Sequence, residues 1–291
     1  MRRCILASIL VAAIGLSGCS FKTMVANKMP DTMDDQSLSF QREKSVRHAR
    51  EAAPAMLKLL DGFILSSPDN PELLIRGAQM NCGFAFILIE DDDPEWASIL
   101  YKKGYEYARK ALAQDVPDLD TLLKGPMDPL ISALKKLDRD RVRSVFWAGN
   151  CLGGYVNLNR EDTEAIAEIP KALALVQRAV EMDEAYYFAG AHLFLGIYYG
   201  SLGVSIGGDP AKSRHHFDRL LALTKGNFLL GKVHDARTYA VQQQDRALFE
   251  KVLTEVMDTA IDPDQDLTLP NAVARKKAAA LLKQAGDLFA N

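Results

Sequence analysis

The fold is decided by residues 184–223, EAYYFAGAHLFLGIYYGSLGVSIGGDPAKSRHHFDRLLAL. Apolar residues recur there at spacings of three and four, which is the period of a helix and not of a strand. Asp209 and Pro210 divide the stretch, because Asp caps exposed amides at a helix start and Pro is well suited to the first helical position. We therefore predict one hairpin of two packed helices over Ala185–Leu223, with Gly196 where the helices cross.

The same helix-start signal recurs along the chain. An Asn or Asp followed directly by Pro precedes a helical pattern at Asn70-Pro71, Asp93-Pro94 and Asp128-Pro129, and Pro54 and Pro170 suggest two further starts. Asp262-Pro263 precedes a polar stretch and is typical of a turn. With no alternating β-branched runs, the sequence predicts an all-α protein of roughly eleven helices.

The predicted helices come in pairs, and small residues recur at matching positions. A tetratricopeptide (TPR) unit has about 34 residues in two helices that cross at small residues. The second-helix pattern occurs in degenerate form at Gly104-Ala108-Ala111, Ala172-Val176-Ala179 and Ser213-Phe217-Leu220. The first-helix pattern occurs at His192-Leu195-Gly196-Tyr199, and more weakly at Trp147-Asn150-Cys151. We expect a right-handed α-solenoid of degenerate TPR-like hairpins, with an unrelated helical bundle as the alternative.

Three loops are longer than a standard repeat allows. We interpret Tyr155–Glu161, Leu202–Gly208 and the acidic Glu90–Asp93 as insertions between helices. Asp91–Asp93 are expected to be solvated. In the Gly207-Gly208-Asp209 loop the Asp would repel an anion, so a turn with a helix cap is favoured over an anion site.

The N-terminus has the features of a secretory signal. Arg2 and Arg3 precede an apolar stretch, Ile5–Gly15, that is too short to span a bilayer. The following Leu16-Ser17-Gly18-Cys19 resembles a bacterial lipobox, which implies cleavage before Cys19 and acylation of its thiol. The alternative is an ordinary secreted protein with a chance Cys. Ser20 in place of Asp favours the outer membrane, so we expect a lipoprotein that is anchored there and faces the periplasm.

The chain is thereby divided into three predicted parts. Residues 1–18 form the signal peptide, residues 19–37 a lipidated Cys and flexible tether, and residues 38–291 the helical domain. The tether prediction rests on Phe21–Gln36, which is polar, contains Pro30 and shows little periodicity.

Composition and chemistry argue against several function classes. A formal net charge of -3, from 35 basic and 38 acidic residues, does not indicate a nucleic-acid partner. No metal-ligand spacing or nucleophile motif stands out, so we expect no metal, no cofactor and no enzymatic activity. A disulfide between Cys82 and Cys151 is permitted in the periplasm, but two separate buried thiols at helix contacts are the favoured interpretation.

Several stretches together resemble one family. They are LIRGAQMNCGFA (residues 74–85), VFWAGNCLGGYVNL (145–158), Ile169–Ala172, the segments already quoted within 184–223 with their continuation to Leu253, and Asn271–Leu282. From Pro54 onward the chain resembles the T components of tripartite ATP-independent periplasmic (TRAP) transporters, the TatT family of TPR lipoproteins. Ser213, Gly231 and His234 depart from the residues usual in that family.

The resemblance implies a role in transport. A T component is thought to partner the transporter's solute-binding protein, to help move an apolar or organic-acid ligand, and in some cases to self-associate. The alternative function is a general TPR interaction scaffold for envelope assembly.

Stacked hairpins present a concave surface to a partner or ligand. We expect Gln79, Leu152, Tyr155, Ile197 and Arg237 near this groove, and Asn81, Asn150, Tyr199 and Tyr239 as polar groups at helix contacts. Hydrogen bonds between helices are the favoured explanation of the polar groups, and exposure to a ligand is the alternative. Arg76 and Arg237 suit a ligand carboxylate, although ion pairs within the protein are favoured.

Overall fold

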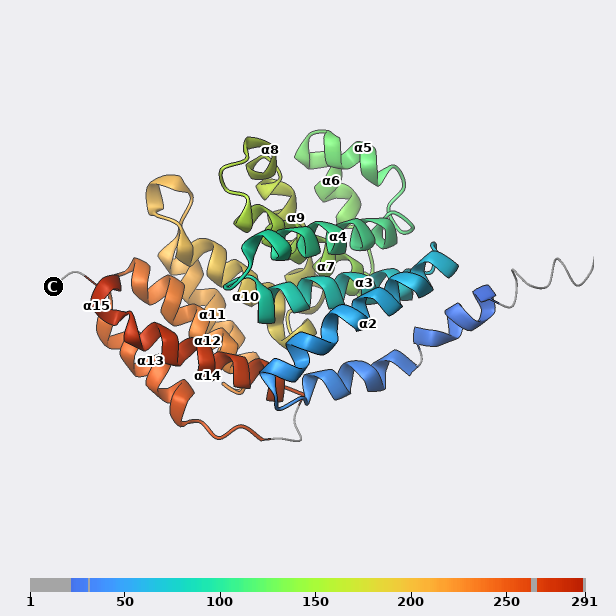
Figure 1. The fold of residues 1–291 in the computed structure, drawn as a ribbon. Coiled ribbons are helices and arrows are strands. Elements are labelled where there is room, and N and C mark those ends of the chain that lie inside the picture. Colours follow the sequence, from blue (N-terminus) through green and yellow to red (C-terminus); the bar gives the residue numbers. More distant parts are fainter. Residues whose placement is uncertain (1–21, 31, 263–265, 290–291) are drawn as a thin grey trace, which may run out of the picture.

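The structure is a computed structural model that describes residues 22–30, 32–262 and 266–289. Over these ranges the chain is helical and contains no strand (Figure 1), which confirms the all-α prediction. The helices are α2 (Val46–Ser66), α3 (Pro71–Phe84), α4 (Pro94–Leu112), α5 (Leu119–Lys124), α6 (Met127–Leu134), α7 (Val142–Leu158), α8 (Thr163–Ile166), α9 (Ile169–Asp183), α10 (Tyr186–Ser201), α11 (Pro210–Leu223), α12 (Leu229–Asp235), α13 (Arg246–Asp258), α14 (Thr268–Lys283) and α15 (Ala285–Leu288). Two π-helical turns, η1 (Ala85–Ile89) and η4 (Ala236–Ala240), and two 3-10 turns, η2 (Arg139–Arg141) and η3 (Val204–Ile206), complete the list.

Helices that follow one another in the chain pack side by side. Helix α3 packs on α4, α4 on α7, α7 on α9, and α10 on α11, while α12, α13 and α14 form the last layer. Figure 1 shows this order as a continuous stack from the N-terminal to the C-terminal helices. The architecture is therefore the expected α-solenoid of helical hairpins, with short helices such as α5 and α8 in the connections.

The predicted hairpin over Ala185–Leu223 is formed by α10 and α11. At their crossing, a Cβ added to Gly196 would lie 3.1 Å from the ring of Phe217. Phe217 and Ser213 are fully buried in α11, and the Ser213 hydroxyl donates a hydrogen bond to the Gly196 carbonyl at 2.8 Å. Small residues thus allow the close approach of the two helices, as the repeat pattern indicates.

Most predicted helix starts are confirmed. The side chains of Asn70, Asp93 and Asp209 each accept a hydrogen bond from the amide three residues later, and a Pro follows each of them in the first helical turn. Asp209 therefore acts as a cap, as the favoured interpretation of its loop required. Pro170 lies in the first turn of α9.

One predicted start is wrong and another is slightly displaced. Pro54 lies inside α2, which begins after Ser45, whose hydroxyl accepts from the His48 amide. The turns before Pro54 remain helical because Ala49 and Ala53 are buried against the body. Asp128-Pro129 lies within the first turn of α6, which begins at Met127. Pro263 of the predicted turn lies outside the described residues.

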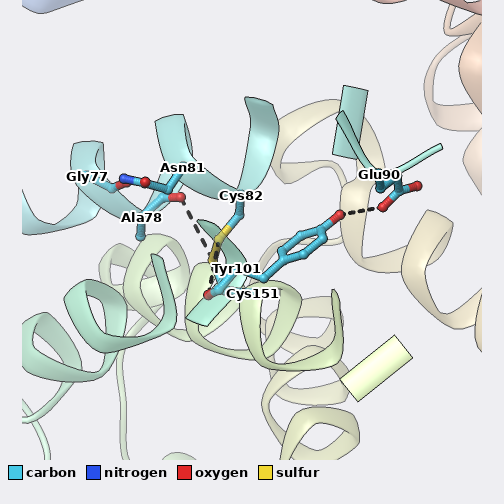
Figure 2. Close-up of a disulfide and its surroundings, with 7 residues drawn as sticks. All are labelled: Gly77, Ala78, Asn81, Cys82, Glu90, Tyr101 and Cys151. Atoms are coloured by element: carbon cyan, nitrogen blue, oxygen red, sulfur yellow. Dashed lines mark hydrogen bonds between the residues drawn. A yellow bond between two sulfur atoms is a disulfide. The ribbon is translucent and has the colours of Figure 1, made fainter. Parts of the chain in front are cut away.

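The two internal cysteines form a disulfide, so the expectation of separate thiols is wrong. Cys82 of α3 and Cys151 of α7 are fully buried, with their Cα atoms 5.6 Å apart. The third helix at this junction, α4, approaches through Gly104, where an added Cβ would lie 2.2 Å from the Cys82 sulfur. Figure 2 shows the disulfide bridging the two helices. The packing of α3, α4 and α7 brings together two cysteines that are 69 residues apart in sequence.

The expected tether is also different in the structure. Residues 22–30 and 32–41 are helical and run beside α2 (Figure 1). Ala26 and Met33 are buried, and the side chain of Asn27 accepts hydrogen bonds from Ser67 and Asn70. Tertiary contacts therefore order a segment whose weak periodicity suggested a spacer. Cys19 and the signal peptide, residues 1–18, lie outside the described residues and remain predictions.

The buried side chains form two main cores. One is built mainly from the helices up to α9, and the other from α10 to α15. Phe86 and Ile87 of η1 pack against both cores. Together α3 and η1 form a continuous apolar helix, Pro71–Ile89, most of whose residues are buried, so it serves as a central core helix of the body.

Candidate ligand cavity

A cavity of about 660 Å³ lies where the two cores meet. Its walls come from residues 33–41, from α2, α3, α7, α9, α10 and α12, from both π-helical turns and from the start of α14. Apolar and aromatic side chains dominate the lining, among them Phe86, Phe146, Trp147, Tyr187 and Phe194. Its size and lining are typical of a site for a small, mostly apolar ligand.

Both π-helical turns line this cavity. Phe86, Ile87 and Leu88 of η1 line it, as do Arg237 and Thr238 of η4. A π-helical turn is rare and recurs at functional sites, since the extra residue re-aims the side chains around it. Ordinary helical periodicity predicted helix at both places but gave no sign of the altered turn.

The start of α10 is bent to present aromatic rings. Tyr187, Phe188 and Ala189 have φ values of 47°, 57° and 56°, in the left-handed region that non-glycine residues rarely adopt. The Tyr187 ring packs edge-on against Trp147, with 4.7 Å between ring centroids, and the Phe188 ring packs against Phe228. Tyr187 and Phe188 both line the cavity, so the strained turn is held by contacts in its wall.

The cavity lining also contains a partly buried carboxyl group, that of Glu90. The Tyr101 hydroxyl donates a hydrogen bond to the Glu90 carboxyl at 2.7 Å, as Figure 2 shows. Burial raises the pKa of Glu90 to about 7, although the charge of Lys277 opposes the shift. Glu90 therefore takes up a proton far more readily than an ordinary carboxylate. The sequence placed it in an acidic loop, and nothing local to that loop indicates burial.

The neighbouring acidic residue, Asp91, pairs with two cationic side chains. Asp91 forms ion pairs with Arg237 of η4 at 3.0 Å and Lys277 of α14 at 2.6 Å. Burial opposes ionisation, but Lys277 and Arg237 outweigh it and lower the pKa of Asp91 to about 2. Asp91 is nevertheless exposed, as are Asp92 and Asp93, so the expectation that this acidic stretch is solvated is confirmed. Its ion pairs tie η1 to both η4 and α14.

The candidate groove residues fall into two groups. Those that line the cavity are Arg76, Gln79, Asn150, Ile197 and Arg237. Those placed elsewhere are Asn81, Leu152, Tyr155, Tyr199 and Tyr239.

Local contacts account for the second group. The Asn81 side-chain amide donates to the Gly77 carbonyl of its own helix at 2.7 Å, so the expected bond between helices is not formed there. The Tyr155 ring lies beneath Lys102, the Tyr199 ring stacks on His216, and the Tyr239 ring lies beneath Arg214. Residue spacing assigned these side chains to helix contacts but could not show which contacts enclose the cavity.

The two arginines that the sequence suggested for a ligand carboxylate, Arg76 and Arg237, are paired within the protein, as the favoured interpretation holds. Arg237 pairs with Asp91, and Arg76 pairs with Asp34 of the N-terminal segment. The Arg76 Nε atom is buried and has no hydrogen-bond partner among the described residues. At another part of the lining, Arg160 is exposed and donates to the side chain of Asn157.

A stack of helical hairpins around a largely apolar cavity defines a helical-repeat protein. Comparison with protein-family models then gives a specific family, because the model described as TRAP transporter T-component matches residues 42–289. The chain belongs to this family, as its sequence resemblance indicated. A search of curated proteins finds no match.

Proposed function

We propose that this protein is the periplasm-facing accessory component of a TRAP transporter, which binds the solute-binding protein and holds an apolar or organic-acid ligand in its cavity. The observation that carries this proposal is the largely apolar cavity of about 660 Å³ in a member of the T-component family. Its task is binding and transfer, not catalysis.

The lining supports this ligand class. Aliphatic and aromatic side chains surround most of the space, and polar groups are few, among them Gln79 and Asn150. Arg76 and Arg160 provide positive charge at the lining, where a ligand carboxylate would bind while its hydrocarbon part occupies the interior. Apolar burial supplies affinity, and a small number of polar groups fix orientation.

The partner contact is expected to be reversible, because a transport partner must dissociate. Transient interfaces bury less than about 1,200 Å² in total. Micromolar affinity corresponds to roughly -8 kcal/mol. Acylation of Cys19 would keep the protein at the membrane, with the outer membrane as the proposed site.

The test uses the solute-binding protein encoded at the same locus. We would titrate it with the purified accessory protein by calorimetry. The titration is run once in the presence and once in the absence of lipid extracted from the native complex of the two proteins. The expected result is a saturable micromolar interaction, and native mass spectrometry should detect a bound small organic molecule. A solute-binding protein from an unrelated transporter is the matched control.

The outcomes separate the two candidate functions. Saturable binding to the cognate partner supports the transport role. No interaction at high micromolar concentration, with both proteins folded, would contradict it and favour a general scaffold for envelope assembly. A scaffold would use the outer surface of the stack, and it would have no need of an apolar cavity between the two cores.

A further inference from the structure

One buried histidine in the cavity wall lacks a hydrogen-bond partner. His234 lies in the last turn of α12, is only 3% exposed and lines the cavity. Its ring stacks on Phe86 of η1, with 4.9 Å between ring centroids. Its Nε2 atom is buried and makes no hydrogen bond within the described part of the chain.

The unpartnered Nε2 atom destabilises the folded protein when no ligand is bound. Buried polar side-chain atoms are nearly always hydrogen-bonded, and an unpartnered one retains its full desolvation penalty. The penalty would be relieved if a ligand in the cavity supplied the missing partner. His234 lines the cavity, so a ligand that displaces the wall atoms around this ring can supply the partner that Nε2 lacks.

The surroundings determine which polar group fits. Burial, and then the positive charges of Arg237 and Lys277, hold the pKa of His234 well below its usual value, while Asp91 acts in the opposite direction. The imidazole is therefore neutral, with one nitrogen as donor and the other as acceptor. A ligand hydroxyl both donates and accepts, so it satisfies Nε2 in either tautomer.

A ligand carboxylate fits this position less well. The nearest cations already serve Asp91, with which both Arg237 and Lys277 form ion pairs. Glu90 also supplies an acidic group to the cavity lining. A charged ligand group here would be buried without a free counter-charge, which is strongly unfavourable.

We propose that His234 Nε2 binds a hydroxyl group of the ligand, so that the preferred ligand is a mainly apolar organic acid with a hydroxyl on its hydrocarbon part. This inference rests on the proposed ligand-holding function of the cavity. The apolar lining takes the hydrocarbon, the carboxylate remains near an arginine such as Arg160, and His234 selects for the hydroxyl.

The proposal is tested with two kinds of probe, myristic acid and its isomers hydroxylated near mid-chain. Purified protein, stripped of co-purified lipid, is titrated with each by calorimetry. Wild-type protein should bind the best-placed hydroxylated isomer about tenfold more tightly, a factor that corresponds to about 1.4 kcal/mol. His234→Leu should abolish this preference, and His234→Gln should retain part of it because an amide also donates and accepts.

A second measurement separates ligand recognition from a structural role. Leu is close to His in size and leaves no unpartnered polar atom, so ligand-free His234→Leu should melt higher than wild type. His215→Leu, on the exposed face of α11, is the matched control and should change neither the preference nor the melting temperature. A His234→Leu variant that is folded but less stable and keeps the hydroxyl preference would show that the ring is merely structural.

The remaining outcomes are equally decisive. Equal affinity of wild-type protein for both probe types would overturn the role of His234 while leaving the ligand-holding cavity intact. Binding of neither probe would overturn both, and titration with the solute-binding protein would then show whether the partner function survives.

Discussion

Ser213 and Gly196 join the two helices of the best-defined repeat, with the Ser213 hydroxyl 2.8 Å from the Gly196 carbonyl oxygen. Both residues lie on the buried faces of the crossing, and the ring of Phe217 covers the position where Gly196 lacks a side chain. The Ser213–Gly196 hydrogen bond and the Phe217 ring both fit at this crossing only because Gly196 has no Cβ. The crossing is therefore sensitive to an increase in side-chain volume.

Gly196→Leu should destabilise the protein by about 1–3 kcal/mol or more, because the new side chain overpacks this crossing. Urea-induced unfolding would measure the change. Gly62→Leu in α2 is the control, since nothing lies within 4 Å of a Cβ added there. The control should be neutral or slightly stabilising, as Leu favours a helix over Gly. Equal stability of Gly196→Leu and wild type would show that α10 and α11 do not cross at this residue.

The Cys82–Cys151 disulfide should contribute substantially to stability. It closes a loop across 69 residues of sequence, and removal of a native disulfide costs about 2–5 kcal/mol. The double variant Cys82→Ala/Cys151→Ala should therefore unfold at lower urea concentration than oxidised wild type. Reductant should have no effect on the double variant but should lower the midpoint of wild type once unfolding exposes the bond. Two free thiols in native, oxidised protein would contradict the structure.

The features that the sequence predicted correctly depend on nearby residues. Asn70, Asp93 and Asp209 each cap a helix by bonding an amide only three residues away, so the necessary information is local. Repeat periodicity likewise predicted the hairpin that contains Gly196. The family resemblance was confirmed because it rested on many such helical segments together.

The features that the sequence did not reveal depend on distant partners. The disulfide forms because α3 and α7 meet, and Glu90 is buried because Tyr101 of α4 covers it. His234 was noticed only as a departure from the family pattern, since its role depends on Phe86 and on a cavity enclosed by many helices. No residue spacing within one helix encodes these juxtapositions.

Glu90 should make stability fall as pH rises. The pKa of Glu90 is raised from 4.5 to about 7 by burial, so the folded state binds this proton more tightly than the unfolded state. The stability contribution is therefore intact below about pH 4.5 and is lost as pH increases towards about 7. Glu90→Gln should remove this dependence and exceed wild type in stability by about 1–3 kcal/mol at neutral pH and above.

Urea unfolding at several pH values would measure this difference between wild type and Glu90→Gln. Glu95→Gln, an exposed substitution in the first turn of α4, is the matched control and should follow the wild-type profile. A constant difference between Glu90→Gln and wild type across the range would show that Glu90 remains ionised in the folded protein.

The ion pair between Asp34 and Arg76 should hold the N-terminal segment against the cavity. This segment contributes Met33, Gln36, Ser37 and Phe40 to the cavity lining. Its Asp34 pairs with Arg76 of α3, which also lines the cavity. Asp34→Lys would place a like charge beside the largely buried guanidinium. Hydrogen exchange of amides 32–41 should become several-fold faster, with little change in α7 or α11. Asp35→Lys, exposed and one residue away, is the control. Unchanged protection would show that apolar contacts alone fix the segment.

Cys19 should carry the membrane anchor. The apolar Ile5–Gly15 stretch and the following Leu16-Ser17-Gly18-Cys19 place the thiol where a lipoprotein signal is acylated and cleaved. Stable attachment requires more than one acyl chain, because each buried CH₂ contributes about 0.8 kcal/mol and a single chain binds only marginally. Wild-type protein should incorporate labelled palmitate during growth and sediment with membranes. Cys19→Ala should lose the label and remain unprocessed at this site, whereas Ser20→Ala should behave like wild type in labelling. Equal labelling of Cys19→Ala and wild type would disprove anchoring through this residue.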